Sequence, residues 1–174
     1  MMGNTMTVTR RQRKLRICRP GAGLVLAAAV AVGLGLAGPI GAATTQQIVV
    51  DRNSGLAISG FDPVAYFTEA QALQGKGEFE QVVAGVPWRF RSEGNSAAFK
   101  ADPDVYMPRF GGYDPVGIAR GVEVAGNPRL WVISGERLFL FYSTETKEEF
   151  VADSDRITTT ADKSWPSISR RLVP

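Results

Sequence analysis

Hydrophobic and polar residues alternate in two stretches of the chain, each broken by a short turn. The first stretch runs from Phe79 to Phe90 around an Ala-Gly dipeptide at 84–85. The second joins 130–133 to 138–142 through a Ser-Gly dipeptide, and its second arm is almost entirely apolar. Alternation around a Gly-containing turn predicts a β-hairpin, and a continuous apolar run is typical of a buried strand. The pattern therefore predicts two hairpins.

Short helices are predicted beside these hairpins. Ser92 is a good N-cap for a helix at Asn95–Lys100. The capping-box pattern that starts at Thr146 predicts a helix there, and a last helix is expected at Thr158–Trp165, ended by Pro166. Two hairpins with helices between and after them favour an α+β fold, in which the hairpins build a small antiparallel sheet with short flanking helices.

The first 43 residues have the pattern of an export signal. Six Lys and Arg residues precede Pro20, residues 21–43 carry no charge, and Gly and Ala surround a cleavage site after Ala43. The alternative is an uncleaved anchor, because the uncharged stretch is long enough to span a bilayer. We therefore expect an export segment at 1–43, an irregular lead-in at 44–54 with a short strand at 48–50, one domain at 55–170, and a periplasmic or secreted location.

The charge balance of the remaining chain differs from that of the whole. The full sequence has 20 basic and 17 acidic residues, and removal of the six leader cations leaves 14 basic and 17 acidic residues, a net charge of −3. The high isoelectric point therefore belongs to the leader and gives no reason to expect a nucleic-acid partner. Contact with a membrane is expected only through an uncleaved leader.

Thiol and imidazole chemistry is excluded after the leader. The sequence has no His, and its one Cys, Cys18, lies in the leader. Without these side chains the chain loses disulfides, thiol redox chemistry and the preferred ligands of zinc, copper and haem. We predict no cofactor and no metal. Carboxylate pairs at 102/104 and 153/155 are weak candidates for a hard cation such as Ca²⁺, because neither has EF-hand spacing.

An Asp-Pro-Val step after Gly and an aromatic residue occurs twice, in GFDPVAYF (60–67) and in GGYDPVGIARG (111–121). Asp is a favoured N-cap and Pro is favoured at the first helical position. Asp62 and Asp114 are therefore interpreted as helix caps rather than as a paired acid/base site. The likeness of the two segments is interpreted as convergence on one turn solution rather than as a duplicated site.

Residues 55–166 resemble the secreted type of YHS-domain protein. The resemblance rests on GFDPVAYF (60–67), GVPWRFRSEGNSAAFKADPDVYMPRFGGY (85–113), WVISGERLFLFY (131–142) and ADKSW (161–165). Relatives that handle metals carry Cys at the positions of Arg91 and Asn95, and the secreted branch carries Cys or selenocysteine at the position of Asp114. The family's aromatic-His-Phe is Trp88-Arg89-Phe90 here. The resemblance thus implies a retained scaffold whose reactive side chains are replaced.

The same resemblance places the candidate ligand site around Tyr66, Arg109, Tyr113 and Asp114. An ion pair of Asp114 with Arg109 or Arg120 is expected to fill the space of the missing thiol. The function expected is an exported binding or interaction module, with a small ligand or a protein as partner and without catalysis of its own. The alternative is a periplasmic redox or metal-handling accessory that uses Asp114 with Arg or Tyr as acid/base.

Overall fold

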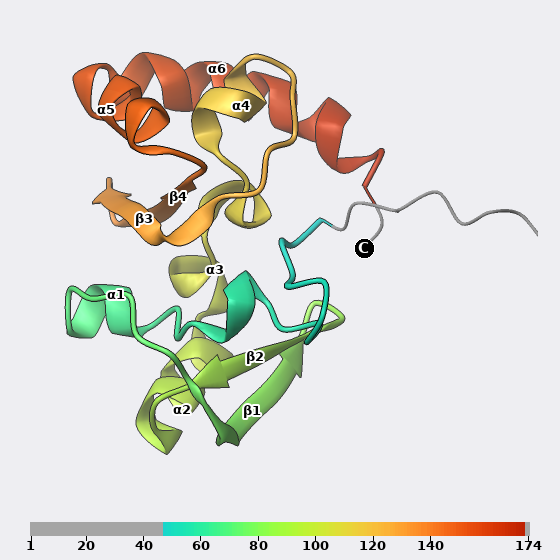
Figure 1. The fold of residues 1–174 in the computed structure, drawn as a ribbon, viewed down its shortest axis with the longest axis vertical. Coiled ribbons are helices and arrows are strands. Elements are labelled where there is room, and N and C mark those ends of the chain that lie inside the picture. Colours follow the sequence, from blue (N-terminus) through green and yellow to red (C-terminus); the bar gives the residue numbers. More distant parts are fainter. Residues whose placement is uncertain (1–46, 173–174) are drawn as a thin grey trace, which may run out of the picture. The chain divides into compact units, whose positions relative to one another are not determined.

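The computed structural model describes residues 47–172 (Figure 1). The elements follow in the order η1 (Ile58–Gly60), α1 (Ala65–Thr68), β1 (Lys76–Val83), β2 (Val86–Phe90), α2 (Glu93–Ala101), α3 (Pro103–Tyr106), η2 (Arg109–Gly112), α4 (Pro115–Ala119), β3 (Asn127–Ser134), β4 (Arg137–Phe141), α5 (Thr144–Ala152) and α6 (Ser154–Ser169). Short helices accompany two antiparallel hairpins, so the α+β prediction is confirmed. The expected export segment lies outside the described residues.

Each hairpin forms its own two-stranded antiparallel sheet, whereas the sequence predicted one small sheet built from both hairpins. In the first, Lys76 lies opposite Phe90, and in the second Asn127 lies opposite Phe141. Both registers shift just beyond this first pair and are then regular up to the turn. An irregularity at the same place in both hairpins bends the longer strand where the chain enters the sheet.

The same order of elements occurs twice in the described chain. Segments 58–101 and 109–152 contain the same four elements in the same order. These are a left-handed kink, a short helix after Asp-Pro, a hairpin with strands of eight and five residues, and a Ser-capped helix of nine residues. We call 57–107 the first repeat and 109–158 the second repeat. The likeness that the sequence showed at one turn therefore extends further in the structure, from η1 and η2 through to α2 and α5.

Glycines at matching positions show that the backbone path is repeated as well. Gly60 and Gly112 have φ of 75° and 90°, which is the left-handed region that favours glycine. Their carbonyl groups accept the N–H of Gly75 at 2.9 Å and of Gly126 at 3.0 Å. A Cβ atom at Gly75 or Gly126 would lie 2.4 Å or 2.6 Å from the nearest atom of β2 or β4. Both hairpins thus require a residue without a side chain where the first strand begins.

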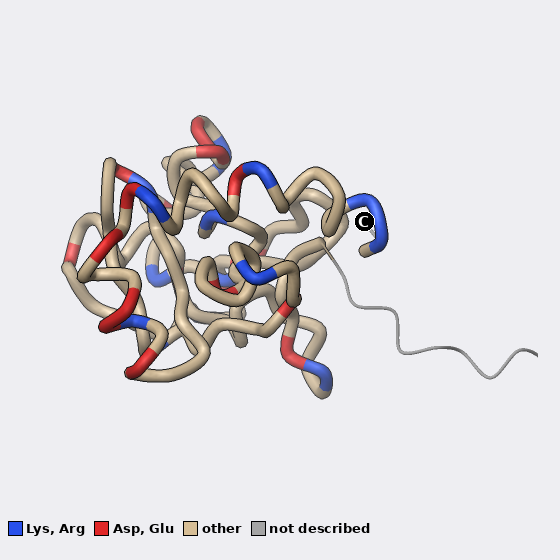
Figure 2. Tube along the Cα trace, turned by 90° about the horizontal axis from the view of Figure 1, so that it is seen from above, with Lys and Arg blue, Asp and Glu red and all other residues tan. Residues whose placement is uncertain are grey.

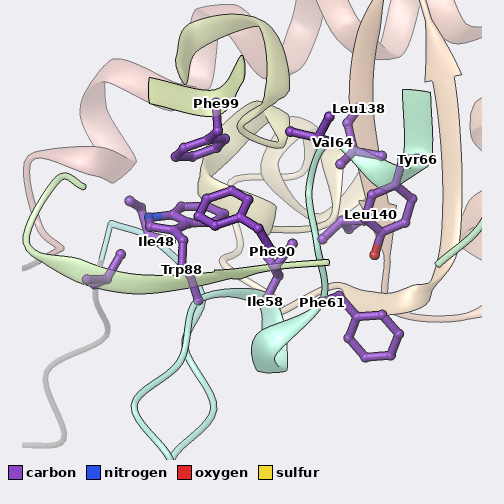
Figure 3. Close-up of a cluster of buried hydrophobic side chains, with 12 residues drawn as sticks. Ile48, Ile58, Phe61, Val64, Tyr66, Trp88, Phe90, Phe99, Leu138 and Leu140 are labelled. Carbon is purple, nitrogen blue, oxygen red and sulfur yellow. The ribbon is translucent and has the colours of Figure 1, made fainter. Parts of the chain in front are cut away.

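Two hydrophobic clusters form the core, and β4 contributes to both. Leu138 and Leu140 lie in the first cluster, with most of the buried side chains of the first repeat (Figure 3). Phe139 and Phe141 lie in the second cluster, beneath α5 and α6. β4 is therefore covered on both faces, as its apolar sequence predicts. β2 instead alternates buried with half-buried residues.

Several predicted boundaries differ from the structure, among them the start of the last helix, which lies at Ser154 instead of Thr158. The predicted strand at 48–50 is reduced to an isolated bridge between Val50 and Ala57. The capping box begins at Ser143 and includes Thr146 at its third helical position, so the prediction that a helix starts at Thr146 is wrong by one turn. Helix α6 continues through Pro166, where the sequence predicted an end.

Candidate functional site

The Asp114 side chain connects three segments of the second repeat. Its Oδ1 accepts the N–H groups of Val116 at 2.8 Å and Gly117 at 3.4 Å. Its Oδ2 accepts the N–H of Tyr142 at 2.8 Å and the hydroxyl of Thr146 at 2.5 Å. The predicted N-cap is confirmed, and the same carboxylate fixes the end of β4 and the first turn of α5.

The first repeat contains the same arrangement. Asp62 Oδ1 accepts the N–H groups of Val64 at 2.8 Å and Ala65 at 3.3 Å. Its Oδ2 accepts the N–H of Arg91 and the Nδ2 of Asn95, both at 2.7 Å. The repeated Asp-Pro-Val segment is thus one structural device used twice.

Both carboxylates are fully used by the fold. Asp62 and Asp114 are 0% and 1% exposed, and each accepts four hydrogen bonds, which is the full acceptor capacity of a carboxylate. A general acid or base needs an oxygen within reach of its substrate. This geometry therefore does not favour the alternative of an accessory protein that uses Asp114 for chemistry.

The expected ion pair of Asp114 with a neighbouring arginine is wrong. Arg109 bonds Asp162 on α6, and Arg120 bonds Glu149 on α5 at 2.7 Å. The backbone N–H and hydroxyl groups around Asp114 satisfy its oxygens at lower desolvation cost than a buried guanidinium would. Both arginines consequently face outward and pair with helices nearer the surface.

The two candidate tyrosines belong to the core. Tyr66 donates its hydroxyl hydrogen to the carbonyl of Pro128 at 2.8 Å, and its ring meets Trp131 edge-on at 5.2 Å. Burial raises the pKa of Tyr66 above its ordinary value. Burial, with a smaller contribution from Glu123, raises the pKa of Tyr113 to about 12. Both phenols are therefore held neutral in the folded protein at physiological pH.

The four residues predicted for a ligand site are thus only partly brought together. Arg109, Tyr113 and Asp114 follow one another along η2 and the start of α4, whereas Tyr66 lies on α1 in the other cluster. Tyr66, Tyr113 and Asp114 are buried, and Arg109 lines a surface pocket.

This pocket has a volume of about 360 Å³ and lies between the second hairpin and α6. Two guanidinium groups, one carboxylate, three hydroxyl groups and one aromatic ring line it. The lining residues are Arg109, Ser134, Gly135, Arg137, Phe139, Asp155, Thr158 and Thr159. A volume of this size is within the range of small-molecule sites.

Arg137 is the most unusual side chain in the pocket. Its Nε is buried without a hydrogen-bond partner among the described residues. Burial, and then the neighbouring charge of Arg109, lower the pKa of Arg137, while Asp104 and Asp162 act in the opposite direction. Buried donors are nearly always paired, so the unpaired Nε sets Arg137 apart from the other described side chains.

The first repeat shows that the scaffold does not need these arginines. By position in the hairpin, Val86 of β2 corresponds to Arg137 of β4, and Ala57 before η1 corresponds to Arg109 in η2. Val86 and Ala57 are both buried in the first cluster. The same structural positions are thus apolar and filled in one repeat, and charged and open in the other.

Sequence analysis of single segments missed Arg137. The signal was present, because alignment of the two hairpins sets Arg137 against a valine. The pocket residues of α6 (Asp155, Thr158 and Thr159) have no such signal. On an amphipathic helix they are indistinguishable from ordinary surface residues.

The described residues contain neither a metal-ligand cluster nor a membrane-spanning helix. Between residues 47 and 172, no cluster of three or more potential acidic or sulfur ligands is placed to hold a metal ion. Asp153, one of the candidate carboxylates, accepts a hydrogen bond from the Nε of Arg156 at 2.5 Å. Over the same residues, every helix is too short or too polar to cross a bilayer.

Comparison with models of protein families, with curated proteins and with solved structures found no match. The resemblance to secreted YHS-domain proteins therefore stays a prediction from sequence motifs.

Proposed function

We propose that this protein is an exported, YHS-like binding module without catalysis of its own, whose pocket beside the second hairpin takes the anionic group of a small ligand. The observation that carries the proposal is the pair of arginines in the pocket lining, Arg109 and Arg137, of which Arg137 has a buried Nε without a hydrogen-bond partner within the described residues. An anionic group bound to the Arg137 guanidinium would oppose the mutual repulsion of Arg137 and Arg109.

A carboxylate fits this wall better than a multiply charged anion. The planar guanidinium presents parallel donors that match a carboxylate. Asp155 also lines the pocket, and Asp162 bonds Arg109 at its edge. These acidic groups would repel a second negative charge on the ligand.

Charge over the rest of the chain supports a small ligand rather than a nucleic acid. Lys and Arg are interspersed with Asp and Glu along the traced chain (Figure 2). Sites for nucleic acid instead gather basic residues on one face.

The lining of the pocket, which has no thiol or imidazole, supports binding over catalysis. The pocket is lined by arginines, hydroxyls, one carboxylate and Phe139. The buried carboxylate of Asp114 fixes the end of β4, which forms part of the pocket wall, to the starts of α4 and α5. A preformed pocket loses little conformational entropy when a ligand enters.

The direct test is a titration of the purified protein with sodium acetate at constant ionic strength, observed through the NMR resonances of arginine Nε–H groups. We expect the Arg137 resonance to shift with saturation. Arg137→Gln should weaken acetate binding about tenfold or more, because it removes the charged donor. Arg52→Gln removes the same charge from an exposed turn and serves as the matched control.

A second variant protects this test against misfolding. Arg137→Val introduces the residue found at the corresponding position of the first repeat, so it should fold and fail to bind. Saturable acetate binding that is unchanged in both Arg137 variants would refute the proposal. Native mass spectrometry of protein from the exported fraction tests the rest: a mass of residues 44–174 is expected, and an uncleaved mass would place the protein at the membrane.

A further inference from the structure

Two charged side chains of the pocket have no ion pair or hydrogen bond among the described residues. Arg109 is bonded to Asp162, but Arg137 and Asp155 have no such partner. They carry opposite charges and line the same pocket. Asp155 is exposed to solvent, and a ligand complementary to both side chains must carry both signs of charge.

We infer that the pocket takes a zwitterion, a small amino acid whose carboxylate binds Arg137 and whose ammonium group faces Asp155. This inference rests on the proposed function, because it requires that Arg137 receives a carboxylate. It adds the second half of the ligand and names Asp155 as the residue that selects it.

The remaining lining fits such a ligand. Hydroxyl groups of Ser134, Thr158 and Thr159 can accept further ammonium hydrogens or donate to the carboxylate. Phe139 supplies an apolar surface for the carbon chain between the two charges. The pocket volume of about 360 Å³ exceeds that of a small amino acid, so waters or a short side chain complete the filling.

Asp155 also has a purely structural role in its helix, which the experiment must distinguish from ligand selection. It lies in the first turn of α6, where a negative charge stabilises the helix. Asp104 occupies the corresponding turn of α3 in the first repeat. A role limited to helix stability would change the unfolding of the protein and leave its ligand preference unchanged.

The experiment is a calorimetric comparison of ligands matched in size. Glycine, β-alanine and γ-aminobutyrate vary the distance between the charges, while acetate, propionate and butyrate lack the ammonium group and the corresponding alkylamines lack the carboxylate. At least one amino acid of the series should bind about tenfold more tightly than its matched acid. Asp155→Asn should abolish this preference without weakening the affinity for the acid, because it also removes a negative charge that repels the acid.

Glu148→Gln is the control for Asp155→Asn, since Glu148 is an exposed acid on neighbouring α5 outside the pocket. Equal affinity for every amino acid and its matched acid would overturn the inference and leave the proposed function intact. A preference that survives in Asp155→Asn would overturn it equally. Absence of carboxylate binding by any probe would instead overturn the proposed function, and the inference with it.

Discussion

The two buried carboxylates do more than cap helices. Each joins the start of a helix, the end of a hairpin and the first turn of the next helix, through four hydrogen bonds. Asp114→Ala should lower the free energy of unfolding by about 3 kcal/mol, because several N–H groups lose their partner inside the protein. Asp62→Ala should cost a similar amount. Urea denaturation followed by circular dichroism measures both.

Ser92→Ala is the control at this scale, since Ser92 caps α2 through one hydrogen bond to the N–H of Asn95. Loss of an ordinary cap costs about 1 kcal/mol. If the aspartate variants were no less stable than Ser92→Ala, the hydrogen bonds that Oδ2 accepts would make no contribution to the free energy of unfolding.

Single residues were predictable from sequence where their contacts are local. Asp-Pro predicted the cap, because the N–H groups that Oδ1 accepts lie two and three positions along the chain. The bonds of Oδ2 were not predictable, because Tyr142 and Thr146 are 28 and 32 positions away. Because these distant partners are not apparent from the sequence, an arginine was wrongly expected beside Asp114. Arg137 was likewise missed in its own segment, because the α6 residues that complete its pocket are distant in sequence.

Helix α6 is the element in which packing outweighs local preference. Proline disfavours a helix interior, yet α6 extends three residues beyond Pro166 to Ser169. Trp165 packs against the ring of Phe110, and Ile168 is buried in the second cluster. Pro166→Ala should therefore raise the free energy of unfolding by about 1 kcal/mol, because it restores a helical N–H in a turn already held by packing. Thermal unfolding and amide exchange at 167–169 measure the change.

Ser167→Ala, in the same exposed turn, restores no N–H and should leave exchange at the end of α6 almost unchanged. If Pro166→Ala were only as stable as the natural protein or less stable, proline's restriction of the unfolded chain would stabilise the fold by at least as much as the missing hydrogen bond destabilises it.

The other elements were predictable where their sequence pattern depends only on residues within the element. Alternation gave both hairpins, and the apolar arm at 138–142 gave a buried strand. The start of α5 was misplaced by one turn because Ser143 and Thr146 both have capping side chains, and the choice between them depends on the bond from Thr146 to Asp114.

The whole molecule is built from two repeats that share a core. Each repeat alone is near the lower size limit for a stable hydrophobic core. β4 of the second repeat places Leu138 and Leu140 in the first cluster, and Tyr66 of the first repeat bonds the carbonyl of Pro128 in β3. Sequence could not reveal this arrangement, because an all-apolar strand does not show which neighbour covers which face.

A shared core predicts that the repeats unfold together. Leu140→Ala should lower the free energy of unfolding by about 3 kcal/mol, since Leu140 is fully buried, and it should do so for both repeats. Native-state amide exchange distinguishes the cases: the most protected amides of α2 and of α6 should lose the same free energy of opening. Val82→Ala, on a side chain 69% exposed in β1, should change neither. If α2 lost protection while α6 kept it, the repeats would be separate folding units. Strand β4 would then be a contact surface between two domains instead of the centre of one.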